Sequence, residues 1–292
     1  MPPAKRVGVG AITLLGGGLC LLAIGAGFCG ATLHVPRSIS PPPAGATTVE
    51  ITAKDNVRLS AWFWHAPEPN GNCVIVLHGI ADSRLGSAGL APMFLKRGYS
   101  VLAPDSRAHG ASGGSLVTYG LLEKYDAIGW AHWMKAAGCR KIYALGESLG
   151  ASILIQAAAV EPAFSAIAAE CPYADLQEIA EYRMRQMLRM REFVATPLAK
   201  LIVISGMLYA DVAYSLDFRQ VSPRQSISRT STPVLLIHGT KDIRTPPSHS
   251  IQLAAANRGA VLWLVPDAGH TGASTADPLE FRRRVLDWFE TH

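Results

Sequence analysis

The chain has 292 residues, of which 49% are hydrophobic, and a formal net charge of +5 at pH 7. This length accommodates one large α/β domain with an appendage, and the apolar content excludes wholesale disorder. Basic residues gather at Arg183–Arg191 and Arg282–Arg284 without the interleaved aromatic residues that stack on bases, so nucleic acid is disfavoured as a partner.

The first predicted element is a membrane anchor over residues 1–33. Lys5 and Arg6 precede Val7–Leu33, which contains no charged residue. About 20 helical residues cross the hydrocarbon core of a bilayer. Positive charge ahead of the span places the N-terminus in the cytoplasm and the rest of the chain on the other side.

A cleaved signal peptide is the alternative for this segment, and it would leave a secreted or periplasmic protein. Cys29-Gly30-Ala31 offers only a weak cleavage site for it. Residues 34–47, which include Pro41-Pro42-Pro43, are predicted to form a proline-rich linker.

Eight apolar or alternating runs predict one sheet within a domain over residues 48–292. The last six runs are nearly continuous, as in parallel strands buried on both faces, whereas the first two are expected to form an edge hairpin turned at Asp55-Asn56. Intervening helical stretches favour an α/β fold with a mostly parallel sheet and helices on both faces. The predicted strands are Val49–Ala53, Val57–Trp64, Cys73–His78, Ser100–Ala103, Lys141–Leu145, Ala166–Glu170, Pro233–His238 and Ala260–Val265, and the predicted helices are Gly86–Arg97, Tyr119–Ala137, Leu149–Val160, Ser248–Arg258 and Pro278–Glu290.

The three cysteines of this domain are Cys73, Cys139 and Cys171. They form no Cys-x-x-Cys pair and have no histidine at the spacing of a zinc site. We expect three buried thiols, and neither a disulfide scaffold, a metal nor a cofactor.

Gly146-Glu147-Ser148-Leu149-Gly150 matches the pattern G-x-S-x-G. The motif lies between a predicted strand and a predicted helix, where a sharp turn exposes the serine hydroxyl at the carboxyl edge of the sheet. This context predicts that Ser148 is a nucleophile.

A serine hydroxyl needs a neutral imidazole to accept its proton, and a carboxylate to orient that imidazole. Asp242 follows the seventh predicted strand and His270 follows the eighth, in the chain order serine, acid, histidine. Asp267 and Asp217 are rival acids. We predict the triad Ser148, Asp242 and His270.

Two backbone N–H groups should stabilise the oxyanion that forms during acyl transfer. One is expected from Leu149, the residue after the nucleophile, and the other from Ile80 in the loop after the third strand. His78, at the end of that strand, is expected to order the loop rather than to act as a base.

Together, these motifs resemble the α/β-hydrolase superfamily, and are most similar to its serine aminopeptidase-like, membrane-anchored branch. The resemblance runs from about Val49 to the C-terminus, and it implies the same triad and oxyanion groups, with structural roles for Arg107 and His109. The motifs that carry it are His78-Gly79, Asp105–Ser112, Gly146–Gly150, His238–Asp242 and Gly269-His270.

Residues 172–231 are expected to form a helical lid inserted after the sixth strand. Asp175 can cap its first helix, and Thr196-Pro197 is expected to open a second helix, with Leu198–Tyr209 apolar nearly all round. Twelve such residues are too few to cross a bilayer, so this helix is expected to be buried or interfacial.

The predicted function is hydrolysis of a carboxylic ester, from a small-molecule or lipid-like substrate, through an acyl-enzyme intermediate. Amide or peptide hydrolysis and acyl transfer remain open, because the same triad performs them. An alternative of another class is a non-catalytic binding protein tethered to the membrane on a hydrolase fold.

Overall fold

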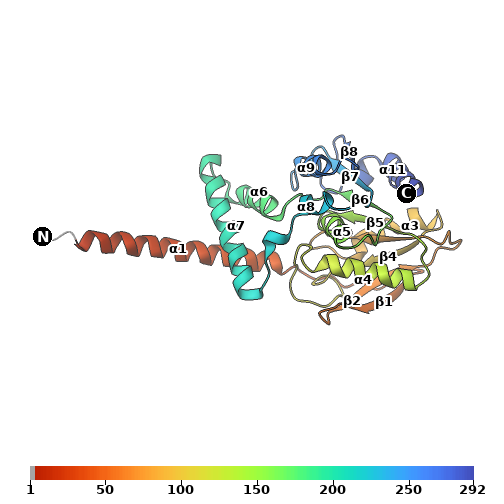
Figure 1. Ribbon diagram of the computed structural model, residues 1–292, viewed down its shortest axis with the longest axis horizontal. Helices are drawn as coiled ribbons and strands as arrows, with labels where there is room; N and C mark the ends of the chain where they lie inside the picture. Colours follow the sequence, from red (N-terminus) through yellow and green to blue (C-terminus); the bar gives the residue numbers. More distant parts are fainter. Residues whose placement is uncertain (1–3) are drawn as a thin grey trace. The chain divides into compact units, whose positions relative to one another are not determined.

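The computed structural model describes the backbone of residues 4–292 and the side chains of residues 16–292, and it divides into two compact units (Figure 1). The helical unit combines the N-terminal segment up to Leu33 with Leu176–Gln220. The sheet unit comprises His34–Asp175 and Val221–His292.

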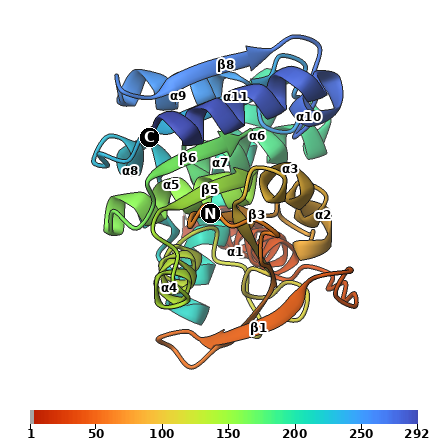
Figure 2. The same cartoon turned by 90° about the vertical axis from the view of Figure 1, so that its right-hand side faces the viewer.

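The sheet unit contains one eight-stranded sheet in the order β1-β2-β4-β3-β5-β6-β7-β8. The first two strands form an antiparallel hairpin, β2 pairs antiparallel with β4, and β3 to β8 run parallel, as the apolar runs predicted. In Figure 2, β1 and β8 lie at opposite edges of the sheet. The strands are β1 (Thr47–Thr52), β2 (Arg58–Trp64), β3 (Cys73–Leu77), β4 (Ser100–Pro104), β5 (Ile142–Glu147), β6 (Ala166–Glu170), β7 (Val234–Gly239) and β8 (Val261–Val265).

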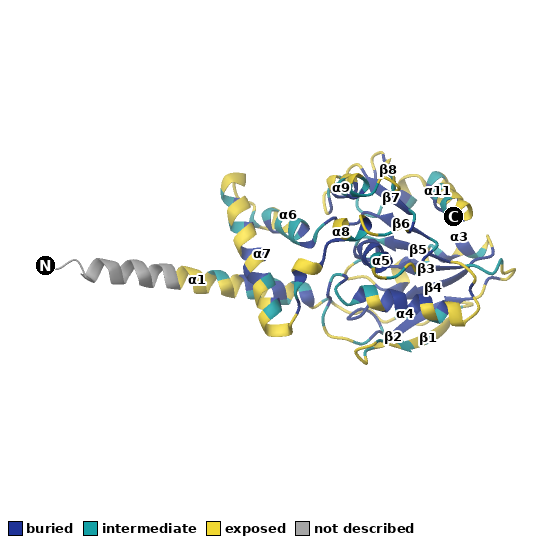
Figure 3. Ribbon diagram, in the orientation of Figure 1, coloured by how far each residue is buried: buried dark blue, intermediate teal, exposed yellow. Residues whose placement is uncertain are grey.

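Helices cover both faces of this sheet (Figure 2). One layer contains α2 (Arg84–Ala88), α3 (Ala91–Leu95), α10 (Ala273–Ala276) and α11 (Pro278–Thr291), and the other contains α4 (Glu123–Ala136), α5 (Leu149–Val160), α8 (Pro223–Ile227) and α9 (Ser248–Ala256). The central strands are buried throughout, which explains their continuous apolar character (Figure 3).

The predicted helix over Gly86–Arg97 is wrong in one respect, because two short helices occupy its place. The chain breaks at Gly89-Leu90, and α3 begins with Pro92 in its first turn. Proline is tolerated there because the first helical N–H groups have no partner within the helix. The prediction joined two periodic stretches across this break.

The expectation of three buried thiols is also wrong, since Cys73 and Cys139 form a disulfide. Cys73 begins β3 and Cys139 lies just ahead of β5, and these two strands are neighbours in which Cys73 pairs with Ile142. Their separation of 66 residues hides the pairing in the sequence. Cys171 is a buried free thiol, as expected.

This disulfide predicts a large stability difference. A cross-link that closes a loop of 66 residues is worth about 4 kcal/mol in the chain-entropy model, because it restricts the unfolded ensemble. We expect Cys73→Ala/Cys139→Ala to lower the free energy of unfolding in urea by about this amount. Dithiothreitol should destabilise the wild type but not the double variant; equal midpoints for the two oxidised proteins would contradict the prediction.

The helical unit contains α1 (Ala4–Leu33), α6 (Leu176–Leu188), α7 (Glu192–Tyr214) and the 3₁₀ turn η1 (Phe218–Gln220). Within the described residues, Gly16–Leu33 and Glu192–Tyr214 are long and apolar enough to cross a membrane, by length and composition alone. The predicted start of the second lid helix is wrong: α7 begins at Glu192 and includes Pro197. Pro197 is exposed near the start of the helix, where its missing N–H removes only the bond to Phe193.

Candidate active site

Ser148 lies on the sharp turn between β5 and α5, with φ 52° and ψ −111°. Such a conformation is strained for a residue with a side chain and persists only where the surroundings enforce it. Here the Ser148 N–H donates to the Glu170 carbonyl of β6 at 2.8 Å, which holds the turn against the neighbouring strand.

The glycines of the motif are required by close backbone contacts. A Cβ at Gly150 would lie 2.3 Å from the Leu77 carbonyl oxygen, and one at Gly146 would lie 2.6 Å from the Ala151 nitrogen. Gly150 therefore lets the start of α5 approach the end of β3, and Gly146 lets it fold back against the end of β5. This is the physical basis of G-x-S-x-G in this chain.

The structure brings Ser148, His270 and Asp242 together from the ends of β5, β8 and β7. The His270 Nε2 atom lies 2.9 Å from Ser148 Oγ, and its Nδ1 atom lies 2.7 Å from Asp242 Oδ2. An imidazole protonated on Nδ1 donates to the carboxylate and leaves Nε2 free to accept the serine proton. This geometry suits nucleophilic catalysis.

Asp242 is fully buried and accepts several hydrogen bonds. Its Oδ1 accepts from the backbone N–H groups of Arg244 and Thr245 at 2.8 and 2.9 Å, and His238 Nε2 lies 3.3 Å from Oδ2. Burial opposes ionisation, but the hydrogen bonds from His238, His270 and Thr245 outweigh it and hold the pKa of Asp242 well below its usual range. The carboxylate therefore stays charged beside His270. His238 is a functional residue that the sequence prediction lacks, although its place in His238-Gly239-Thr240-Lys241-Asp242, four residues before the acid, signals it.

The two rival acids have other partners. Asp267 is exposed and pairs with Lys241 at 2.7 Å, and Asp217, in the helical unit, pairs with Arg219 at 2.6 Å. Among the described residues, the carboxylate that pairs with His270 is that of Asp242.

The two predicted oxyanion donors, the N–H groups of Leu149 and Ile80, lie in segments next to the nucleophile: Leu149 in α5 and Ile80 in the loop after β3. Leu149 is the first residue of α5, where N–H groups lack partners within the helix. Ile80 follows Gly79, at which a Cβ would lie 3.4 Å from the Ser148 Cβ, so this loop passes close to the nucleophile. A Cβ at position 79 would make an ordinary van der Waals contact with the serine.

Two buried histidines fix the Ile80 loop. His78 Nδ1 donates to the Gly79 carbonyl at 2.7 Å and Nε2 accepts from Ser106 N–H at 3.1 Å, while His109 Nε2 accepts from Ala81 N–H at 3.2 Å. Burial and the nearby His109 lower the pKa of His78 to about 3, so it stays neutral. The expected ordering role of His78 is confirmed.

Arg107 and His109 also have the structural roles that the resemblance implied. Arg107 lies in the loop after β4 and forms ion pairs with Asp126 and Asp55, each at 2.7 Å. His109 links the same loop to Ala81.

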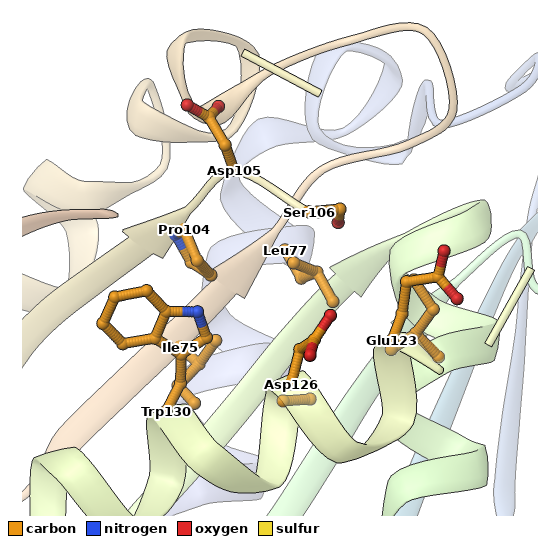
Figure 4. Close-up of a pocket in the computed structure, with 10 residues that line it drawn as sticks. Ile75, Leu77, Pro104, Asp105, Ser106, Glu123, Asp126 and Trp130 are labelled. Atoms are coloured by element: carbon orange, nitrogen blue, oxygen red, sulfur yellow. The ribbon is translucent and has the colours of Figure 1, made fainter. Parts of the chain in front are cut away.

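A cavity of about 10 Å³ lies between β3, the end of β4 and α4, lined by Asp105, Glu123 and Asp126 among other residues (Figure 4). A cavity of this size is just large enough to hold about one water molecule. No predicted triad residue lines it, so we assign it to the interior packing rather than to substrate binding.

Cys171, His238 and Asp242 carry ligand-type atoms within 4.8 Å of one another. Asp242 and His238 are already hydrogen-bonded, and burial raises the pKa of the Cys171 thiol far above its ordinary value. A thiol is a poor metal ligand compared with a thiolate. This group is therefore poorly suited to holding a cation, and His238 instead helps to position Asp242.

Two carboxyl groups, Glu147 and Glu170, lie at paired positions of β5 and β6 beside the nucleophile. Glu170 is fully buried: Oε1 accepts from Ala273 N–H at 2.9 Å, and Oε2 has no partner among the described residues. Burial and the proximity of Glu170 raise the pKa of Glu147 to about 8, and burial raises the pKa of Glu170 to about 7. Both carboxyls therefore stay protonated to a higher pH in the folded protein than an ordinary glutamate does.

These raised pKa values predict a stability that declines with pH. Between the ordinary glutamate value of 4.5 and the folded-state values of about 7 and 8, the native state binds more protons than the unfolded state, so the free energy of unfolding falls as pH rises. We expect the two carboxyls to contribute a loss on the order of a few kcal/mol between pH 5 and pH 9 in urea titrations, which the lowered pKa of His78 offsets in part below its ordinary value of 6.5. Glu147→Gln, which is neutral at every pH, should flatten this dependence, and an unchanged slope would contradict the assignment.

The comparisons with known proteins agree on the family. A profile of the alpha/beta hydrolase family matches residues 74–284. The chain is 29% identical to the uncharacterised protein YqkD of Bacillus subtilis over 77% of this chain and 73% of that protein. It is 26% identical to the uncharacterised protein YfhR of Escherichia coli K12 over 85% and 82% of the two chains.

The fold is shared with solved structures. The esterase Pf2001 of Pyrococcus furiosus superposes with a TM-score of 0.73 at 25% identity, covering 89% of this chain and 98% of that one. A puromycin-hydrolysing peptidase of Mycobacterium tuberculosis has a TM-score of 0.66 at 20% identity, covering 86% of this chain and 40% of that one. The family match spans more than half of the chain, and together with the eight-stranded sheet it shows that this protein is a hydrolase of the alpha/beta hydrolase family.

Proposed function

We propose that the protein is a serine hydrolase that cleaves carboxylic esters, with Ser148 as nucleophile, His270 as general base and Asp242 as the orienting acid. The hydrogen-bonded chain from Asp242 through His270 to Ser148 carries this proposal. Ser148 Oγ would attack the ester carbonyl while His270 Nε2 accepts its proton, and the same imidazole would protonate the leaving alcohol. The N–H groups of Leu149 and Ile80 would stabilise the oxyanion.

The similarity to the esterase Pf2001 supports an ester substrate. Amide or peptide hydrolysis remains the second candidate, because the triad does not choose the leaving group and a peptidase shares the fold. We expect kcat/KM to be higher for p-nitrophenyl esters of graded chain length than for aminoacyl anilides. Faster cleavage of the anilides would mean that the protein is a peptidase rather than an esterase. No turnover of esters or anilides, together with no labelling by a fluorophosphonate, would favour a non-catalytic binding protein.

We also propose that α1 anchors the protein in a membrane, with the sheet unit on the non-cytoplasmic side. The uncharged run up to Leu33 supports the anchor, and the Cys73–Cys139 disulfide supports an oxidising compartment, where such bonds persist.

The anchor predicts the behaviour of the full chain during fractionation. We expect it to stay with the membrane fraction through high-salt and carbonate washes, because about 20 apolar residues buried in the hydrocarbon core are not displaced by salt or alkali. Mass spectrometry should find a mature N-terminus ahead of residue 33. A mature N-terminus beyond Leu33 would establish a cleaved signal peptide instead.

A further inference from the structure

Helices α1 and α7 make close backbone contact within the helical unit. A Cβ on Gly206 would lie 2.8 Å from the Gly25 carbonyl oxygen, and one on Gly25 would lie 2.7 Å from the Gly206 nitrogen. The Ser205 hydroxyl lies 3.2 Å from the Leu21 carbonyl oxygen across the interface and 2.9 Å from the Ile202 carbonyl oxygen of its own helix, so its one proton is shared between the two acceptors. Small residues that allow close backbone contact, and serine hydroxyls that hydrogen-bond to the facing helix, are typical of helix pairs in membranes. Lipid is itself apolar, so burial of apolar surface does not drive helices together there.

The contact lies near the C-terminal end of α1, and α7 runs across α1 rather than along it (Figure 1). From Val7 to Gly25 a helix rises about 27 Å. The hydrocarbon core of a bilayer is about 30 Å thick. If α1 enters the membrane just after Lys5 and Arg6, α7 therefore crosses it near the opposite membrane surface.

The face of α7 turned away from this contact is apolar and exposed. Leu201, Ile204, Leu208 and Val212 follow one another at helical spacings of three or four residues, and they are 51%, 43%, 53% and 80% exposed. No charged residue occurs from Leu201 to Ala210, and Asp211, the one charged residue before Val212, pairs with Arg219 at 3.5 Å. A helix whose outer face meets water carries polar residues there, whereas a continuous exposed apolar stripe indicates a partner or a lipid surface.

Residues 183–193, here called the α6–α7 turn, comprise the end of α6, the connection and the start of α7, and they combine apolar and basic side chains. Phe193 is 74% exposed and Met190 is 49% exposed. Residues 183–192 contain four arginines and one glutamate. Basic residues beside exposed aromatic and apolar ones suit the boundary between acyl chains and anionic headgroups.

We propose that α7 lies along the non-cytoplasmic surface of the same bilayer that α1 spans, with its Leu201–Val212 stripe among the acyl chains and the arginines of the α6–α7 turn at the lipid phosphates. The inference rests on the proposed anchoring by α1 and goes beyond it, because α7 and the α6–α7 turn, which lie between β6 and β7 in the chain, become a second membrane-binding element. The occupant of the stripe is lipid, since the crossing point and the basic turn both place it at a membrane surface.

The depth of α7 in the bilayer tests this. In full-length protein with Cys20→Ser, which removes the exposed free thiol, an environment-sensitive fluorophore is attached at Ile204→Cys or Leu208→Cys. The protein is reconstituted in vesicles of phosphatidylcholine and phosphatidylglycerol that contain nitroxide lipids labelled near the headgroup or at the chain end. A matched control carries the label at Leu279→Cys in α11, a leucine 77% exposed in the sheet unit.

We expect shallow nitroxides to quench positions 204 and 208 more strongly than deep ones, because an interfacial helix lies about 5–10 Å below the headgroups. The Leu279 control should show no quenching. Stronger quenching by deep nitroxides would mean that α7 is a transmembrane helix. No quenching, in protein that floats with the vesicles, would mean that the stripe lies outside the lipid. Each of these two results overturns the proposal for α7 but leaves the anchoring by α1 intact. Failure to float would overturn the anchor and this inference together.

Discussion

Ser148→Ala is expected to lower kcat for ester hydrolysis by about 10⁵-fold or more while leaving the fold unchanged. The reason is that Ser148 Oγ, 2.9 Å from His270 Nε2, is the atom that would form the acyl-enzyme. Such a loss corresponds to about 7 kcal/mol of transition-state stabilisation. Residual activity would come only from substrate binding and the oxyanion donors.

A fluorophosphonate probe separates loss of the nucleophile from loss of structure. It should label the wild type at Ser148, as mapped by mass spectrometry, and should leave Ser148→Ala unlabelled. Ser228→Ala serves as a matched control, because Ser228 is exposed at the end of α8 and should be dispensable. An alanine variant at position 148 that keeps most of its turnover would refute the assignment.

The strands could be predicted because burial on both faces leaves a simple signature. Ala166–Glu170 was predicted residue for residue, and the other seven strands to within one or two residues at each end. The turn at Ser148 could also be predicted, since a Cβ at Gly146 or Gly150 would lie less than 3 Å from backbone atoms and only glycine fits there. Local sequence encodes local geometry well where a single backbone requirement dominates.

Features that depend on which strands are neighbours could not be predicted in the same way. The Cys73–Cys139 disulfide exists because β5 lies next to β3 although β4 comes between them in the chain. The hydrogen bond that Glu170 accepts from Ala273 joins segments 103 residues apart. The contact of Gly25 with Gly206 likewise joins two apolar helices whose pairing has no local sequence signal.

Asp242→Asn is expected to lower kcat/KM for esters by about 10⁴-fold. The carboxylate accepts a hydrogen bond from His270 Nδ1–H, with 2.7 Å between Nδ1 and Oδ2, and so holds the tautomer whose Nε2 is unprotonated toward Ser148. An asparagine amide can donate to Nδ1 instead, which stabilises the tautomer that carries its proton on Nε2, where it cannot accept the serine proton. The loss should fall mainly on kcat, because Asp242 is buried behind the histidine.

Two matched substitutions show whether the effect belongs to this acid. Asp267→Asn removes only an exposed pair with Lys241, and Asp217→Asn removes a pair with Arg219 in the helical unit, so both variants should keep near-wild-type rates. Thermal unfolding of all three variants separates catalysis from stability, since Asp242 also accepts the N–H groups of Arg244 and Thr245. Equal rate losses at Asp242 and Asp217 would mean that the triad acid is another residue. A rate loss in the Asp242 variant alone, with the protein still folded, is the result expected if this buried carboxylate orients the general base through its hydrogen bond.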